Sequence, residues 1–388
     1  MKLTEEQRDW LALTLVPGVG TVHFIRLLAR FRTPGQVLRA SMGALREVVG
    51  PKLSERIANY SEAADVDGQA RQMEEYGAEL ITMNDGLYPM RLAEIYDPPL
   101  ILFTRGRLLD TDERSVAIVG TRKATPYGIR MAEKFGRELA ARGITVVSGM
   151  ALGVDSAAHR GALEAGGRTI AVLGCGVDTV YPQRNADLME AIARQGCVLS
   201  QFPMGTKVSK GHFPYRNRII SGMTMGTLIV QAPMRSGALI TAHQALEQGR
   251  EVFAIPGEVG QRNSEGPHAL IREGAKLVET VEDILLELNL LEQPPVAAPS
   301  TPSSAYAPVG NERTVAKQTR IAPPSEPVRT PAHAARARTE GSVAPTPTSS
   351  APLAAPLKGI EGDMLSVLSP DGSHVDEIAA ACRISVSE

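Results

Sequence analysis

The middle of the chain alternates short apolar runs with amphipathic segments. Between about residue 70 and residue 290, runs rich in Val and Ile recur, and segments with helical periodicity separate them. Continuous apolar strands that alternate with helices are typical of a mostly parallel sheet with helices on both faces. We therefore expect an α/β fold built on a Rossmann-like, doubly wound sheet.

The pattern places most of these elements. The predicted strands are 115–119, 144–148, 169–173, 198–200, 227–230 and 251–255. The predicted helices are 129–142, 155–165, 185–194, 219–223 and 238–248. Two further apolar runs, 78–82 and 100–103, are expected to extend the sheet at one edge. A last strand and helix are expected at 276–279 and 281–288.

The two ends of the chain have different patterns. Residues 1–68 read as short helices, interrupted by turns at 16–21 and 49–52. The turn with Gly18 and Gly20 is either an ordinary turn between packed helices or a helix-hairpin-helix whose amides hold a DNA phosphate. After a central domain at 69–290, the Pro- and Ala-rich residues 291–357 predict a flexible tether. Residues 358–388 resemble the start of a winged helix.

Composition restricts the kinds of function. The 388 residues carry a net charge of −2, so any binding to nucleic acid depends on a local basic patch. The three cysteines have no metal-ligand spacing, which fits a reducing cytoplasm and argues against a zinc site. Neither a secretion signal nor a long apolar run is apparent, so we expect a cytoplasmic protein without a membrane span.

One such basic patch lies between Gln201 and Arg218. The segment contains four Lys or Arg side chains and no carboxylate, with Phe202, Phe213 and Tyr215 among them. Cations that hold phosphates, interleaved with rings that accept a base, are typical of a groove for single-stranded nucleic acid. The alternative is a basic loop whose rings fill the core.

Other glycine-rich loops follow the predicted strands. Because a parallel sheet binds ligands beyond the carboxyl ends of its strands, the loops at 120–123, 148–155, 174–178 and 232–237 should meet at one rim. Glycines let the backbone approach an anion, and helix starts supply free amides. The sequence therefore predicts a basic pocket for phosphate groups.

Named enzyme motifs are missing from these loops. Thr179 stands where the dinucleotide fingerprint needs a glycine or alanine, and neither a Walker A motif nor a nucleophile elbow occurs. No carboxylate pair stands in the basic loops to hold Mg²⁺. Asp155 and His159 could form an acid–base pair, but we favour a helix N-cap for Asp155 and a hydrogen bond to a neighbouring loop for His159.

Taken together, the motifs resemble the DNA-processing protein A family (DprA, also called Smf). The resemblance rests on Ile118-Val119-Gly120-Thr121-Arg122, Ser148-Gly149-Met150-Ala151-Leu152-Gly153-Val154-Asp155, Phe213-Pro214-Tyr215-Arg216-Asn217-Arg218, Ser236-Gly237-Ala238-Leu239-Ile240-Thr241 and Val252-Phe253-Ala254-Ile255-Pro256-Gly257. These motifs occur in the family's order through about 115–275. The N-terminal helices resemble the family's sterile-alpha-motif-like domain.

The resemblance implies a bacterial protein that is not an enzyme and needs no cofactor or metal. It implies binding of incoming single-stranded DNA, loading of the RecA recombinase during natural transformation, and a homodimer formed through the Rossmann domain. The family's usual Glu is replaced by Gln201 and Gln231, which makes the pocket more positive. From the loops and the resemblance together, the predicted DNA-binding residues are Gly120, Thr121, Arg122, Lys123, Ser148, Gly149, Gly153, Gly174, Gly176, Lys207, Lys210, Phe213, Arg216, Asn217, Arg218, Arg235, Ser236 and Gly237.

Two other functions fit the same pattern. A nucleotide-processing hydrolase of the lysine-decarboxylase-like type also uses glycine-rich loops on phosphates, but it needs a Glu base where Gln201 and Gln231 stand. A scaffold would keep the basic pocket as a relic and recruit partners through the tethered C-terminal segment.

Overall fold

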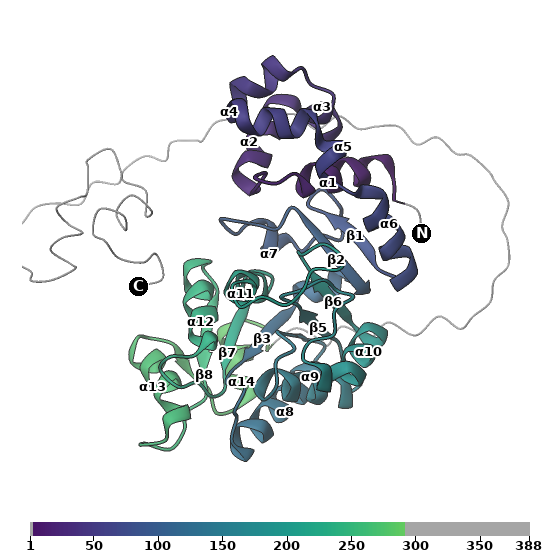
Figure 1. Ribbon diagram of the computed structural model, residues 1–388. Helices are drawn as coiled ribbons and strands as arrows, with labels where there is room; N and C mark the ends of the chain where they lie inside the picture. The colour runs from purple at the N-terminus through teal and green to yellow at the C-terminus, as the bar shows by residue number, and fades with distance from the viewer. Residues whose placement is uncertain (1–2, 292–388) are drawn as a thin grey trace, which may run out of the picture. The chain divides into compact units, whose positions relative to one another are not determined.

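A nine-stranded sheet runs through the centre of the chain. Figure 1 shows the computed structural model. The structure describes residues 3–291. The strands are β1 (Glu79–Thr82), β2 (Ile101–Gly106), β3 (Ser115–Val119), β4 (Thr145–Ser148), β5 (Thr169–Val172), β6 (Cys197–Ser200), β7 (Gly226–Ile229), β8 (Glu251–Ala254) and β9 (Lys276–Leu277). Their order is β1-β2-β6-β5-β4-β3-β7-β8-β9. All pairs from β6 to β9 are parallel, whereas β2 is antiparallel to both of its neighbours.

Helices precede the sheet and connect its strands. The N-terminal helices are α1 (Glu5–Leu15), α2 (Thr21–Phe31), α3 (Pro34–Leu38), α4 (Met42–Ala58), α5 (Tyr60–Ala63) and α6 (Val66–Tyr76). The later helices are α7 (Met90–Ala93), α8 (Pro126–Ala141), α9 (Val154–Glu164), α10 (Ala186–Gln195), α11 (His212–Gly222), α12 (Gly237–Glu247), α13 (Glu265–Arg272) and α14 (Val281–Glu287).

Alternate residues of the central strands pack on opposite layers of helices. In β3, Ala117 and Val119 belong to the core with α7, α11, α12 and α13, whereas Val116 and Ile118 face α8, α9 and α14. A strand that is buried on both sides has no polar face, which explains why these strands appear in the sequence as continuous apolar runs. The expected α/β fold with a doubly covered, mostly parallel sheet is therefore confirmed.

The N-terminal helices share one core with the antiparallel edge of the sheet. Trp10 and Phe24 lie in the same buried cluster as Phe103 of β2 and Met204. The domain boundary predicted at residue 68 falls inside α6. The segment labelled α4 consists of two helices that meet at a kink at Gly50, where φ is 75° and ψ is 175°, so the backbone turns within the expected 49–52.

Most element boundaries agree with the sequence analysis, including β1 and β2 at the edge. One prediction was wrong: the helix expected at 219–223 begins at His212. Pro214 occupies the first turn of α11, where its missing N–H leaves no intrahelical hydrogen bond unmade. Helix α13 was missed.

Two further predictions concern the C-terminal part of the chain. The tether at 291–357 lies outside the described residues apart from its first position, and the segment at 358–388 lies outside them altogether. None of the helices in the described part is long and apolar enough to cross a bilayer.

Candidate nucleic-acid interface

The direction of the chain reverses at the centre of the sheet and leaves a crevice there. From β3 the chain continues through β4 and β5 to β6 on one side, and α11 then returns it to β7 on the other side of β3. In open α/β sheets, ligands bind beyond the carboxyl ends of the strands at such a point. A cleft of about 300 Å³ lies there. Its lining includes Gly120, Thr121, Arg122, Asp155, Phe213, Arg216, Asn217, Arg235, Ser236, Gly237 and Thr241.

The floor of the cleft holds a buried arginine, with the buried carboxyl group of Asp155 nearby. Arg216 is only 5% exposed, and its guanidinium donates to the carbonyl oxygens of Gly149 (2.9 Å) and Val172. Burial lowers the pKa of Arg216 to about 10, although the nearby Asp155 opposes this shift. The two hydrogen bonds therefore fix the strand ends at Gly149 and Val172 against α11.

Asp155 is held from the loop side as well. Its Oδ2 accepts a hydrogen bond from the Ala151 amide (3.3 Å), and the Gly149 amide also donates to it. Burial raises its pKa to about 6, while Arg216 and these two amides act in the opposite direction. The predicted N-cap role is wrong, because Gly153 is the N-cap of α9 and Asp155 is the second residue of the helix.

Two glycines let the rim loops approach each other. A Cβ on Gly120 would lie 2.8 Å from the carbonyl oxygen of Gln231, and one on Gly153 would lie 2.4 Å from that of Thr121. Gly153 also has a φ of 84°, which side chains other than glycine rarely adopt. The close contacts bring the amides after β3 next to the start of α9.

Exposed cations lie in the cleft lining and in the loop before α11. Arg122 is exposed, and its guanidinium carbon lies 5.1 Å from the centroid of the Phe213 ring. Arg235 lies exposed in the loop before α12, whose N-terminus opens toward the cleft. Lys207 and Lys210 are exposed in the loop before α11. Among residues 3–291, none of these four cations has a carboxylate partner within ion-pair distance, so their charge is available to an anion.

The polar groups beside α12 complete the wall. Ser236 caps this helix, since its side chain accepts from the Ala238 amide (3.3 Å) and its carbonyl accepts from the Leu239 amide (3.0 Å). The Asn217 side chain donates to the Gly237 carbonyl (3.4 Å) and accepts from Arg216 Nε (3.2 Å). These contacts link α11 to the start of α12 across the cleft.

Other predicted site residues lie behind or beside the cleft. The Ser148 hydroxyl is buried and donates to the carbonyl of Ile118 (2.6 Å). Gly174 packs under the Phe213 ring, and Gly176 packs against Asp178. Arg218 points away from the cleft lining and pairs with Asp97 (3.4 Å). Lys123, Gly149 and Gly153 also lie outside the lining.

His159 is a structural residue of the sheet interface. It is fully buried, and its Nδ1 lies 2.6 Å from the Thr169 hydroxyl in β5, rather than against a loop. Burial lowers its pKa to about 3, so it is neutral at ordinary pH. It is therefore not an acid–base partner of Asp155.

Sequence analysis missed several contacts around the cleft. Gln231 accepts from the amide (3.0 Å) and the hydroxyl (3.2 Å) of Thr125, the residue that caps α8. Tyr181 lies 5.7 Å from the Phe213 ring. No local signal indicates either contact, because the partners are distant in the sequence.

Comparison with known proteins identifies the family. The sequence profile of DNA recombination-mediator protein A matches residues 79–289. This range includes all nine strands of the sheet and every element around the cleft. The chain belongs to the DNA recombination-mediator protein A family. The resemblance found in the sequence is thus confirmed, and the family is one of DNA-processing proteins.

Individual members of the recombination-mediator family cover most of the described chain. The chain is 38% identical to Protein Smf of Synechocystis over 292 residues, which are 74% of this chain and 73% of that protein. It is 40% identical over 257 residues to the DNA processing protein DprA of Bacillus subtilis, covering 66% of this chain and 82% of that protein. The X-ray structure of DprA from Streptococcus pneumoniae aligns with a TM-score of 0.66 at 36% identity, covering 74% of this chain and 99% of that one.

Proposed function

We propose that the chain binds single-stranded DNA in the cleft at the carboxyl end of the sheet. The observation that carries this proposal is the combination of exposed Arg122 and Arg235 with helix-start amides and the Phe213 ring around one cleft. Phosphates would lie at the 120–123 and 235–238 loops, between the two arginines. Bases would stack on the ring, which a duplex does not expose.

Buried and exposed arginines have different roles in this proposal. Arg122, Lys207, Lys210 and Arg235 contact phosphates, whereas Arg216 supports the floor from below. Because phosphates are the main contacts, the affinity depends weakly on sequence and falls steeply with salt. A DNA affinity that does not change with salt would contradict this arrangement.

Removal of Arg122 tests the site. We expect Arg122→Ala to weaken binding of a labelled single strand about 10- to 100-fold in fluorescence anisotropy, the usual effect of a charge-assisted hydrogen bond. Arg130→Ala is the matched control, because Arg130 is also exposed but belongs to the body of α8. Equal losses in the two variants would show a general charge effect and would overturn the site.

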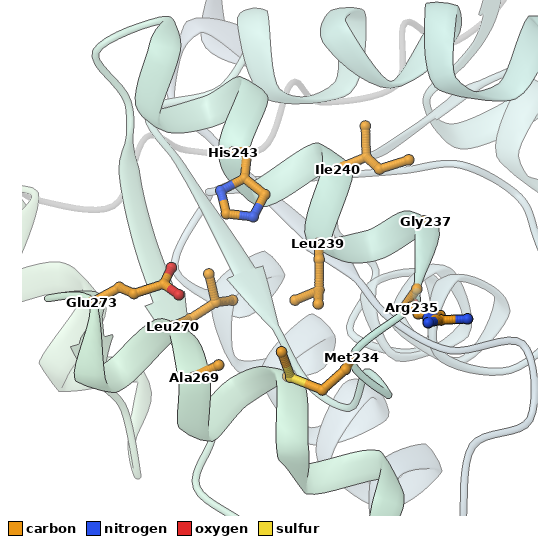
Figure 2. Close-up of a pocket in the computed structure, with 11 residues that line it drawn as sticks. Met234, Arg235, Gly237, Leu239, Ile240, His243, Ala269, Leu270 and Glu273 are labelled. Carbon is orange, nitrogen blue, oxygen red and sulfur yellow. The ribbon is translucent and has the colours of Figure 1, made fainter. Parts of the chain in front are cut away.

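The chain also offers a surface for a homodimer. A groove of about 460 Å³ lies between α12 and α13. Leu239, Ile240, His243 and Leu270 are among its lining residues (Figure 2). Ile240 is 42% exposed, and it lines both this groove and the DNA cleft. We infer that a second copy of the chain covers the groove. Such a dimer would place two DNA clefts next to each other and bind longer strands by avidity.

Light scattering tests the dimer. Ile240→Asp should convert it to a monomer, because a carboxylate would be buried without a partner. Leu286→Asp is the control, since Leu286 is also exposed but lies on α14. A wild-type chain that is monomeric at every concentration would exclude this part of the proposal.

In this proposal the protein protects incoming DNA and loads RecA on it in natural transformation. The support is membership of the recombination-mediator family together with a cleft suited to a single strand. The test is the DNA-dependent ATPase activity of RecA on a single strand covered by a competing single-strand-binding protein. Addition of the wild-type chain should shorten the lag, and Arg122→Ala should not.

The cleft supports binding better than hydrolysis. Gln201 and Gln231 are amides without basic character, and both are engaged, with Arg218 and Thr125 respectively. The one carboxylate in the cleft lining, Asp155, is held by two backbone amides and Arg216. Release of base or phosphate from nucleoside monophosphates would instead establish the hydrolase alternative.

A further inference from the structure

A second aromatic surface lies on the other side of α11 from the DNA cleft. Residues two apart in a helix are separated by about 200° around its axis. Phe213 and Tyr215 therefore point to opposite sides of the first turn of α11. Phe213 lines the cleft, whereas Tyr215 is absent from its lining and is 46% exposed.

The Tyr215 ring is fixed on one face by a buried cation. The guanidinium carbon of Arg218 lies 4.3 Å from its centroid, and Arg218 is only 7% exposed. Arg218 is itself fixed, because it donates to Gln201 Oε1 (2.7 Å) and pairs with Asp97 (3.4 Å). Its Nη1 has no hydrogen-bond acceptor among the described residues. The interaction with the ring therefore takes the place of a conventional partner.

The edge of the ring is fixed as well. The Tyr215 hydroxyl donates to Asp97 Oδ2 (3.3 Å), the carboxylate that also pairs with Arg218. Phe202 packs at the side of the ring, with centroids 6.5 Å apart and an angle of 58°. Phe202 in turn stacks on His212 at 4.3 Å. An exposed ring that is held in one orientation loses little conformational entropy when a flat ligand stacks on it.

Two exposed lysines precede α11, the helix that carries both Phe213 and Tyr215. Lys207 and Lys210 are exposed in the loop that leads into α11, and both lack a carboxylate partner in the described part of the chain. A strand that leaves the cleft across the start of α11 would have its phosphates near these ammonium groups. Its next bases would then reach Tyr215.

We propose that Tyr215 is a second stacking platform, which binds an unpaired base of the same DNA strand after it leaves the cleft. This inference rests on the proposed function of the cleft and extends it to a separate face of α11. The ligand is an unpaired nucleobase, because only a flat aromatic group matches a single exposed ring with cations on one side. The platform thus predicts a dependence of affinity on strand length.

The test is fluorescence anisotropy with labelled oligothymidylates of about 4 and about 16 nucleotides, the usual limits of a single-strand site. Tyr215→Ala should weaken binding of the longer strand about 5- to 100-fold, since stacking contributes about 1–3 kcal/mol at 1.4 kcal/mol per factor of ten. Binding of the shorter strand should not change, because it fits in the cleft alone. Tyr215→Phe is the matched control and should bind both strands like the wild type.

Two results would overturn the platform. One is equal affinity of wild type and Tyr215→Ala for the longer strand. The other is an equal loss in Tyr215→Phe, which would assign the effect to the hydroxyl bond with Asp97. An unchanged melting temperature shows that the alanine variant is folded. Failure of the proposed function looks different: wild type and Arg122→Ala would then bind the short strand equally weakly.

Discussion

At the scale of single residues, burial decides which cations can reach DNA. The sequence predicts DNA contacts for Arg122, Arg216 and Arg218 alike. In the structure Arg216 and Arg218 are buried, whereas Arg122 is exposed. A buried guanidinium needs compensating partners, and here Asp155 and Asp97 supply them. In the proposed function, the buried arginines therefore shape the site, and the exposed ones would contact the DNA.

The rim depends on one glycine in particular. We expect Gly153→Ala to destabilise the fold by about 2–4 kcal/mol, because its φ is positive and its Cβ would meet two backbone carbonyls. It should also weaken DNA binding, since the 120–123 loop must shift. Gly43→Ala is the control, as Gly43 lies in α4 with no atom near the added Cβ. Thermal unfolding that is equal in the two variants would show that the contact is unimportant.

The buried His159 makes the free energy of unfolding depend on pH. Its folded pKa is about 3 and its ordinary value is 6.5, so acidification below about pH 6.5 protonates the unfolded chain first and favours unfolding. Asp155 acts in the opposite direction between about pH 6 and pH 4, because its folded pKa is raised to about 6. When the pH falls from about 7 to about 4.5, the free energy of unfolding should therefore decrease by about 2 kcal/mol less in His159→Gln than in the wild type. Urea unfolding at both pH values measures the difference, and equal losses would contradict the neutral buried imidazole.

At the scale of elements, one ion pair ties together several strand ends. Asp112 is buried before β3 and accepts two hydrogen bonds from Arg168, each 2.8 Å long. It also accepts from the Thr145 hydroxyl in β4 (2.7 Å). Arg168 precedes β5 and donates to the Arg107 carbonyl after β2. The pair thus connects the amino ends of three parallel strands.

Loss of the Asp112 carboxylate should lower the free energy of unfolding strongly. Asp112→Ala is expected to destabilise the chain by about 3–5 kcal/mol, because it leaves a largely buried guanidinium without its partner. Glu164→Ala breaks the exposed pair with Arg137 and should lower the free energy of unfolding far less, because solvent screens an exposed pair. Denaturant unfolding of both variants gives the comparison. Similar costs would show that the Asp112 pair contributes no more than a surface pair.

The sequence predicted where the strands and helices lie better than the directions in which their side chains point. Continuous apolar runs identified every central strand, because burial on both faces leaves a strong local signal. The start of α11 was misplaced, since Gly211 and Pro214 weaken the helical pattern that tertiary packing restores. The helix phase that separates Phe213 from Tyr215 could not be known without that start.

At the scale of the whole molecule, the sheet brings distant loops together at one rim. The cleft combines residues from 119–122, 151–155, 213–220 and 233–241. The sequence predicted this convergence because parallel strands share the direction of their carboxyl ends. It could not predict that Arg122 rests on Phe213, which depends on side chains separated by 91 positions of the chain, from 122 to 213.

The central claim is that single-stranded DNA occupies this rim. Amide hydrogen exchange of the full chain, with and without a saturating oligothymidylate, tests it most directly. Binding at the rim should slow exchange in the 120–123, 149–155 and 235–238 loops and at the start of α11. Protection confined to the N-terminal turns at 16–21 and 49–52, with none at the rim, would contradict it.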